Sequence, residues 1–95
     1  MRLTNAERTE ITRIIRKEVR DAEIYIFGSR IDDGARGGDL DILVIGDEKL
    51  SLQRLLHLKI LLKDRLGDQK IDLVYQRKGE LSLFAQTVKL DAVRL

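Results

Sequence analysis

The stretch from Ile24 to Ile45 contains two apolar, strand-like runs around a middle segment rich in glycine and charged residues. The first run ends at Gly28, and the second starts directly after Asp39 and carries Asp41 near its beginning. Side chains at positions i and i+2 of a strand point to the same face, so Asp39 and Asp41 should lie together. The stretch therefore predicts two strands with a glycine turn and a carboxylate pair between them.

Hydrophobic periodicity places helices and further strands around this stretch. Thr4 and Glu7 have capping-box spacing, and Ser51 and Gly67 bound a second apolar helix. We expect helices at residues 5–20, 52–66 and 81–90, strands at residues 23–27, 40–45, 70–76 and 92–95, and a turn or short helix followed by a loop at residues 28–38. This order predicts an α+β (α/β-like) fold, a small sheet with helices packed on it. Periodicity leaves open whether the first two strands run parallel or antiparallel.

Composition bounds the architecture and the class of function. With 95 residues, 43% of them hydrophobic and 36% charged, the chain is expected to form one soluble, globular domain over residues 1–95. The absence of cysteine excludes disulfides and a thiol nucleophile, and we expect a cytoplasmic protein without a membrane segment. The 18 basic residues nearly balance the 16 acidic ones, and a net charge of +2 is too weak to indicate nucleic-acid binding by itself.

The predicted middle helix is apolar around well over half of its circumference. Its large apolar side chains are Leu52, Leu55, Leu56, Leu58, Ile60, Leu61, Leu62 and Leu66. A surface helix of a small domain needs only one apolar stripe. Two interpretations stay open. In the first, the helix is buried on two sides or has an irregular apolar stripe. In the second, its extra apolar face contacts a partner chain.

Gly28, Ser29 and Arg30 form a candidate phosphate site at the end of the first predicted strand. Glycine lets the backbone approach a ligand closely, Ser29 adds a hydroxyl donor, and Arg30 adds a charge-assisted donor. If a helix begins here, its free N–H groups also favour a phosphate. The alternative is an ordinary turn.

Asp39, Asp41 and Asp72 form a candidate metal site. Two carboxylates on one face repel each other, and a bound Mg²⁺ or Mn²⁺ ion removes that repulsion. Asp72 interrupts the apolar run of the third strand, and it would join the pair if the strands are neighbours. It could then bind a second metal ion or take a proton from an attacking hydroxyl. In the alternative, one carboxylate pairs with Arg30 or Arg36 and the other faces water.

The combined pattern resembles the Gly-Ser…Asp-x-Asp signature of the nucleotidyltransferase superfamily related to polymerase beta. Its parts in this chain are Gly28-Ser29-Arg30, Gly34, Arg36-Gly37-Gly38-Asp39-Leu40-Asp41 and Ile71-Asp72-Leu73. The resemblance covers nearly the whole chain and is greatest for minimal nucleotidyltransferase (MNT) domains, often the antitoxin of a two-protein toxin–antitoxin pair. Many relatives carry serine in place of Gly38, so one hydroxyl contact is missing here.

This resemblance implies a nucleotidyltransferase fold with a mixed sheet and antiparallel first two strands. It implies that Gly28 and Ser29 hold the phosphates of a nucleoside triphosphate and that Asp39 and Asp41 hold two divalent metal ions, with Asp72 completing one metal site and acting as or positioning the general base. The implied reaction is Mg²⁺-dependent transfer of AMP from ATP to a hydroxyl. The implied acceptor is a tyrosine of a partner toxin of the HEPN helical class, in a hetero-oligomer.

Other functions are compatible with the sequence. A non-catalytic antitoxin could neutralise its partner by covering it, an interpretation motivated by the apolar face of residues 52–66. A transferase for a small-molecule acceptor such as an aminoglycoside is less favoured, because such enzymes usually carry an additional helical domain. A template-copying polymerase is disfavoured for the same reason and by the weak net charge of +2.

Overall fold

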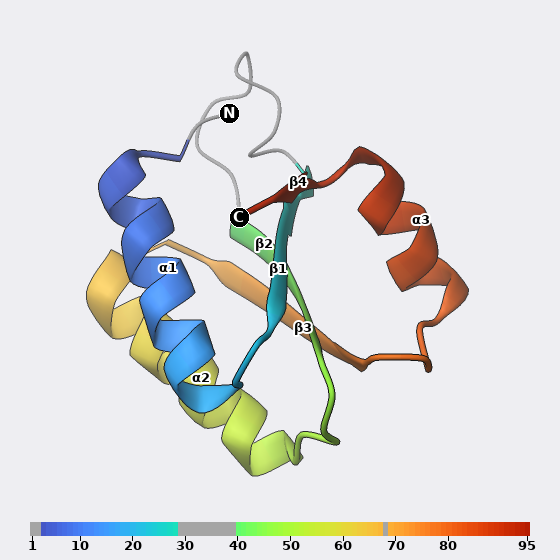
Figure 1. Cartoon of the computed structure of the whole chain (residues 1–95). Helices are drawn as coiled ribbons and strands as arrows, with labels where there is room; N and C mark the ends of the chain where they lie inside the picture. Colours follow the sequence, from blue (N-terminus) through green and yellow to red (C-terminus); the bar gives the residue numbers. More distant parts are fainter. Residues whose placement is uncertain (1–2, 29–39, 68) are drawn as a thin grey trace.

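A computed structural model of the chain describes residues 3–28, 40–67 and 69–95. Its elements, in chain order, are α1 (Asn5–Glu18), β1 (Glu23–Phe27), β2 (Leu40–Gly46), α2 (Leu52–Leu66), β3 (Ile71–Arg77), α3 (Leu83–Asp91) and β4 (Val93–Arg94). This confirms the predicted order of helices and strands and the α+β class (Figure 1). None of the described helices is long and apolar enough to cross a membrane.

The four strands form one mixed sheet in the order β3-β2-β1-β4. Strands β1 and β2 pair antiparallel, as do β1 and β4, whereas β2 and β3 pair parallel. The antiparallel pairing of β1 and β2, which periodicity left open, confirms the expectation drawn from the family resemblance. Strand β2 is therefore a central strand, and its run of apolar residues from Ile42 to Ile45 is buried.

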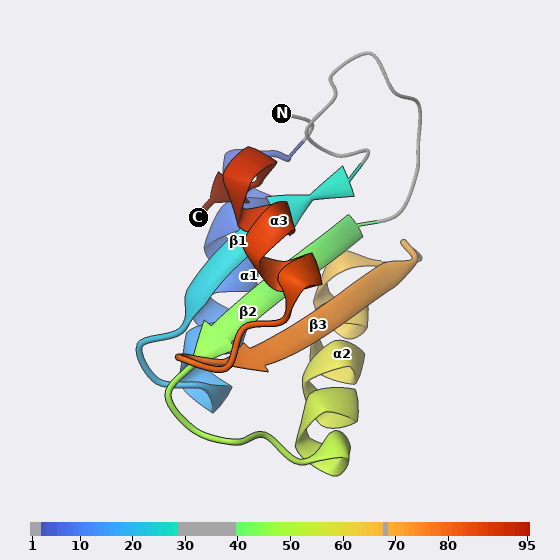
Figure 2. The same ribbon diagram turned by 90° about the vertical axis from the view of Figure 1, so that its right-hand side faces the viewer.

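Two apolar clusters cover opposite faces of the sheet. Helices α1 and α2 lie on one face and α3 lies on the other, as Figures 1 and 2 show from two sides. The larger cluster joins Ile11 and Ile15 of α1 and Leu58 and Leu62 of α2 to alternate strand residues such as Ile42. The smaller cluster, on the α3 face, has four buried members: Tyr25, Leu43, Ile45 and Ala85. Because side chains alternate along a strand, each strand residue points toward one of these two faces of the sheet.

Side-chain caps fix the helix ends and correct some predicted boundaries. The capping box predicted for α1 is present: Thr4 Oγ1 accepts from the Glu7 N–H at 3.1 Å, and the Thr4 N–H donates to Glu7 Oε1 at 3.0 Å. The first helix ends at Glu18 rather than residue 20, because Val19 is extended. The last begins at Leu83 rather than Leu81, because Ser82 is extended and its hydroxyl caps the Ala85 N–H.

The strand boundaries differ from prediction by a residue or two. Strands β2 and β3 extend to Gly46 and Arg77, while β3 starts at Ile71 rather than Lys70. The short last strand spans only Val93–Arg94, because that is the length over which the chain pairs with β1.

Helix α2 is not buried on two sides. Leu58 and Leu62 face the core, while Leu52, Leu56 and Ile60 are between 50% and 70% exposed. Because these three residues are spaced by four, they form one stripe along the outer surface of the helix. We call Leu52, Leu56 and Ile60 the α2 stripe. Its exposure excludes burial of the helix on two sides and leaves two interpretations, an irregular stripe and a surface that contacts a partner chain.

Candidate functional site

The candidate site lies where β1 ends and where β2 and β3 begin. Phe27 is the register partner of Asp41 across the antiparallel pair, and Asp41 is the register partner of Asp72 across the parallel pair. Neighbouring strands are about 4.8 Å apart, so these three residues form a row across the sheet. Figure 2 shows the end of β1 and the starts of β2 and β3 together at one edge of the molecule.

Asp41 and Asp72 project from the same face of the sheet. Leu40 and Ile42, which flank Asp41, belong to the cluster under α1 and α2. Ile71 and Leu73, which flank Asp72, contact that cluster as well. Because side chains alternate along a strand, both carboxylates must point to the α3 side. The structure thus brings together two of the three carboxylates predicted from the sequence.

Gly28 lies directly against the carboxylate of Asp41. A Cβ atom added at Gly28 would overlap Asp41 Oδ2 and would lie 3.1 Å from the Asp41 carboxyl carbon. Gly28 also has a φ of +76°, which L side chains rarely adopt. The glycine is therefore required twice, for the turn that ends β1 and for the space that the carboxylate occupies. Glycine at this position lets the backbone approach the Asp41 carboxylate closely.

Three predicted site residues lie outside the described part of the chain: Ser29, Arg30 and Asp39. Within residues 3–28, 40–67 and 69–95, no three His, Cys, Asp or Glu side chains are grouped so that they could hold a metal ion. The described portion of the site is a pair of carboxylates, and Asp39, the third predicted member, precedes the start of β2 by one residue.

The carboxylate pair has the chemistry of a divalent-cation site. Asp41 and Asp72 are directly opposite each other, and like charges in that position destabilise a sheet. Both are partly exposed, so a ligand can reach them. Carboxylate oxygens are the ligands that Mg²⁺ prefers, and it commonly uses one or two of them together with substrate phosphates. The residues present therefore fit a magnesium–nucleotide complex.

A second cluster on the α3 face joins α3 and β4 to β1. The hydroxyl of Tyr25 donates to Glu23 Oε1 at 2.8 Å, and Lys89 Nζ lies 3.9 Å from the same oxygen. Lys89 Nζ also lies 5.4 Å from the centre of the Tyr25 ring, and the Arg94 guanidinium carbon lies 5.9 Å from it. The hydrogen bond from Tyr25 holds the pKa of Glu23 below its usual value, and burial raises the pKa of Tyr25. The cluster holds α3 against the sheet.

This cluster predicts acid-sensitive stability. Because the folded-state pKa of Glu23 is lowered, its stabilising contribution is complete above the unfolded-state pKa of about 4.3 and is lost as the pH falls towards the folded-state pKa. Replacing Glu23 by Gln should lower the free energy of unfolding at pH 7 and change it less at pH 3. Urea unfolding at several pH values measures this, with the exposed Glu80→Gln as the matched control. An equal effect of Glu23→Gln at both pH values would contradict the assignment.

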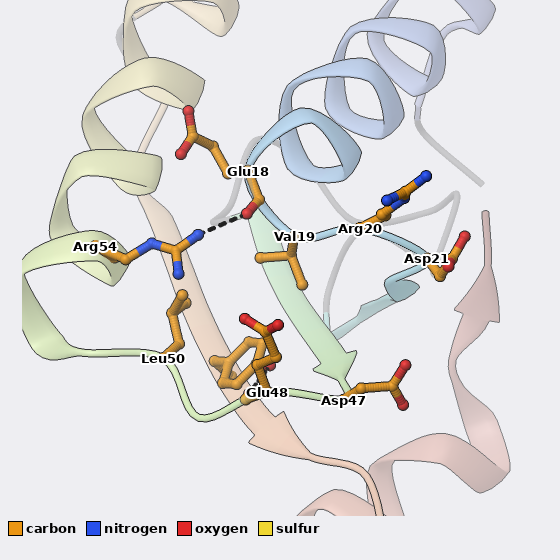
Figure 3. Close-up of a pocket in the computed structure, with 9 residues that line it drawn as sticks. Glu18, Val19, Arg20, Asp21, Asp47, Glu48, Leu50 and Arg54 are labelled. Atoms are coloured by element: carbon orange, nitrogen blue, oxygen red, sulfur yellow. Dashed lines mark hydrogen bonds between the residues drawn. The ribbon is translucent and has the colours of Figure 1, made fainter.

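A hollow of about 240 Å³ lies at the other end of β2, roughly 20 Å from the start of that strand. Figure 3 shows that it is formed by the end of α1, the residues after β2 and the first turn of α2. The guanidinium of Arg54 donates to the Glu18 carbonyl at 2.7 Å and joins α2 to α1 there. The Tyr75 hydroxyl donates to the Glu48 carbonyl. These contacts are structural and bring no catalytic group to the hollow.

Tyr75 belongs to β3, and it packs against the larger apolar cluster. A Cβ atom at Gly46 would meet the Tyr75 hydroxyl and would lie 2.8 Å from Val19 Cγ1, so this glycine makes room for the ring. Burial raises the pKa of Tyr75 above its usual value. Its hydroxyl donates the hydrogen bond to the Glu48 carbonyl.

Sequence reasoning missed an aromatic pair beside the carboxylates. Phe27 and Phe84 are the chain's only two phenylalanines, and their ring centres lie 5.9 Å apart with a 77° angle between the ring planes. The spacing of Phe84, Ala85 and Val88 in the sequence is that of a single apolar helix face. Ala85 is buried, but Phe84 is 52% exposed. The pairing joins residues far apart in the sequence, so no local pattern could have indicated it.

One known protein family matches nearly the whole chain. The family described as Polymerase beta, Nucleotidyltransferase matches residues 9–93. No curated protein matches the chain.

Solved structures share the fold over almost the whole chain. A chain in the structure of tri-AMPylated Shewanella oneidensis HEPN toxin in complex with MNT antitoxin is 23% identical, with a TM-score of 0.73 over 94% of this chain and 68% of that chain. A toxin–antitoxin structure with AMP-PNP matches at 25% identity and a TM-score of 0.75, over 90% of this chain and 69% of that chain. A structure provisionally described as a nucleotidyltransferase matches at 25% identity and a TM-score of 0.66, over 95% and 98% of the two chains.

Proposed function

Because the chain belongs to the polymerase beta nucleotidyltransferase family, we propose that it transfers AMP from ATP to a hydroxyl group of a partner protein. The partner is a HEPN toxin, the acceptor is a tyrosine of that toxin, and the transfer makes this chain the antitoxin of the pair. The observation that carries the proposal is the register of Asp41 with Asp72, beside a glycine that approaches the Asp41 carboxylate.

The proposal gives each residue of the site one task. Gly28 brings the backbone to the phosphates, because it has no side chain between the end of β1 and Asp41. Ser29 and Arg30, the next residues of the chain, hydrogen-bond the phosphate oxygens. Asp72 accepts the proton of the attacking hydroxyl or orients that hydroxyl.

The same residues fit a magnesium site. Asp39, Asp41 and Asp72 would hold Mg²⁺, which when bound neutralises phosphate charge and lowers the pKa of a coordinated hydroxyl. The oxygen of the acceptor attacks the α-phosphorus of ATP, the bond from that phosphorus to the bridging oxygen breaks, and pyrophosphate leaves. In this proposal the acceptor and the phosphates would meet at one edge of the sheet, which is the positioning that such a transfer requires.

The similar structures support the choice of partner and nucleotide. One contains an AMPylated HEPN toxin with an MNT antitoxin, and another is a toxin–antitoxin structure with AMP-PNP, an ATP analogue. A protein acceptor also agrees with the partial exposure of Asp41 and Asp72, since a macromolecular hydroxyl must approach them from outside.

A labelling experiment tests the proposal. The protein is mixed with its partner toxin, with Mg²⁺ and with ATP labelled on the α-phosphate. We expect label on a tyrosine of the toxin, identified by mass spectrometry, and loss of toxicity. Label on neither protein, in the presence of active toxin, would exclude AMP transfer between them. Label on a small molecule instead would favour the aminoglycoside-type alternative.

A second candidate function is neutralisation by binding alone, and the exposed α2 stripe is the observation that favours it. Leu52, Leu56 and Ile60 offer an apolar surface on α2, which lies on the other side of the sheet from α3 and the carboxylates. A toxin seated on this surface would be bound whether or not AMP is transferred. If the Asp41→Asn protein neutralises the toxin as fully as the wild type, binding is sufficient.

Replacing Leu56 by Gln examines the α2 stripe directly. Leu56 is half exposed, so the free energy of unfolding should change by no more than about 0.5 kcal/mol. If the toxin covers the stripe, its dissociation constant should rise about 10-fold or more, because a buried Leu contributes that much at an interface. Calorimetric titration measures the affinity of the wild type and of Leu56→Gln for the toxin. Leu90→Gln, a substitution at an equally apolar and more exposed position on α3, is the matched control. Unchanged affinity in Leu56→Gln would place the toxin elsewhere.

A further inference from the structure

Phe84 is a half-exposed aromatic side chain in the first turn of α3. It contacts Phe27 edge to face, with 5.9 Å between the ring centres. Phe84 keeps 52% of its maximum exposed surface despite this contact. A Phe in the first turn of a helix is not required by the cap, which is supplied by the Ser82 hydroxyl.

The position of Phe84 connects it to the candidate active site. Its contact, Phe27, is the last residue of β1 and the register partner of Asp41. Phe27, Asp41 and Asp72 all project from the α3 face of the sheet. Phe84 therefore lies on the same side of the sheet as the carboxylates, and it contacts the ring of the residue that is the register partner of Asp41.

Helix α3 holds Phe84 in place rather than leaving it on a loose segment. The next residue, Ala85, is fully buried against the sheet. Near the other end of the helix, Lys89 contacts both Glu23 and the ring of Tyr25. A ring whose backbone is fixed and whose neighbour is a second ring has little freedom to lose when it contacts a ligand.

We propose that Phe84 is the stacking surface for the base of the nucleoside triphosphate, a contact that rests on the proposed function. The ligand class is a flat aromatic base linked to phosphates, with the phosphates at Gly28 and the carboxylates and the base over Phe84. Stacking on an aromatic side chain tolerates every base, because every base has a π-face. Phe84 therefore supplies affinity for the base and does not itself select adenine.

Two probes separate this role from phosphate binding. AMP-PNP presents a base and three phosphates, whereas inorganic tripolyphosphate presents the phosphates alone. In the whole chain with Mg²⁺, Phe84→Ala should raise the dissociation constant for AMP-PNP about 10-fold or more and leave that for tripolyphosphate within about 2-fold. Phe84→Trp should bind AMP-PNP as tightly as the wild type or more tightly. Calorimetric titration measures each of these affinities.

Controls distinguish a local effect from lost folding. Phe84→Leu keeps an apolar side chain on Phe27 but has no π-face, so it should lose AMP-PNP affinity like Phe84→Ala and unfold at an unchanged urea midpoint. Leu90→Ala, an exposed apolar position at the far end of the same helix, should alter neither affinity. Equal loss of both ligands in Phe84→Ala, or loss of neither, would overturn the inference. A wild-type protein that binds tripolyphosphate but not AMP-PNP would overturn it as well, whereas one that binds neither would overturn the proposed nucleotide site itself.

Discussion

Replacing Asp41 by Asn is expected to lower the rate of AMP transfer about 100-fold or more without unfolding the protein. The substitution keeps the size of the side chain but removes the negative charge that a divalent cation requires, and losses of this size follow removal of a single charge-stabilising group at an active site. The same result is expected for Asp72→Asn, because the two residues are register partners on one face of the sheet. Transfer of label from ATP to the toxin measures the rates.

The free energy of unfolding provides an independent test of the Asp41–Asp72 pair. Opposed like charges on paired strands destabilise a sheet, so with cations removed by EDTA the Asp72→Asn protein should be more stable than the wild type by up to about 1 kcal/mol. With excess Mg²⁺ the wild type should be the more stable of the two proteins, since it alone gains stability from the bound ion. Asp64→Asn, at an exposed position on α2, is the matched control for both measurements. Full transfer activity in Asp41→Asn and Asp72→Asn would show that these carboxylates are not catalytic.

Replacing Gly28 by Ala is the second change with a large expected effect. The added Cβ would overlap Asp41 Oδ2, so either the end of β1 or the carboxylate must move. The positive φ adds about 1–2 kcal/mol of strain for any residue with a Cβ. A shift of about 1 Å in a catalytic group can lower a rate 100-fold, and we expect that loss of transfer together with a lower free energy of unfolding.

Gly79→Ala separates the two contributions. Gly79 also has a positive φ, of +83°, but nothing lies within 4 Å of an added Cβ there. This variant should show the backbone strain alone, with AMP transfer close to that of the wild type. The further destabilisation in Gly28→Ala should shrink when Asp41 is replaced by Ala, because the overlapping atom is then gone. Equal activity and stability in Gly28→Ala and Gly79→Ala would show that the contact with Asp41 has no consequence.

Local chemistry made much of the fold predictable from the sequence. The Thr4–Glu7 capping box and the Ser51 cap depend on residues three positions apart, and both are present. The alternation in the sequence agrees with the structure, which places Ile71, Leu73 and Tyr75 on one face of β3 and Val74 on the other. The first residue of α3 was predicted wrongly, since Leu81 continues the apolar pattern while Ser82 supplies the cap.

The sequence indicated which residues belong to the candidate site but not how they are arranged in space. Gly28, Asp41 and Asp72 could be identified because a glycine after a strand and carboxylates inside apolar runs are local signals. Ser29, Arg30 and Asp39 belong to the same signature and lie outside the described residues. The contribution of Phe84 could not be identified, because its apolar spacing is that of a buried helix face. The sheet below α3 buries Ala85 and leaves Phe84 half exposed.

The sequence by itself determined which residues form helices and strands, since caps and periodicity act over a few residues. Only the tertiary structure decided that β2 pairs parallel with β3 in the register that places Asp41 opposite Asp72, and that Gly28 lies against the Asp41 carboxylate. The physical reason is that a register is selected by the burial of whole strand faces: a slip of one residue would turn every side chain of a strand to the other side of the sheet. Such a choice depends on α1, α2 and α3 together, and no single stretch of the chain contains it.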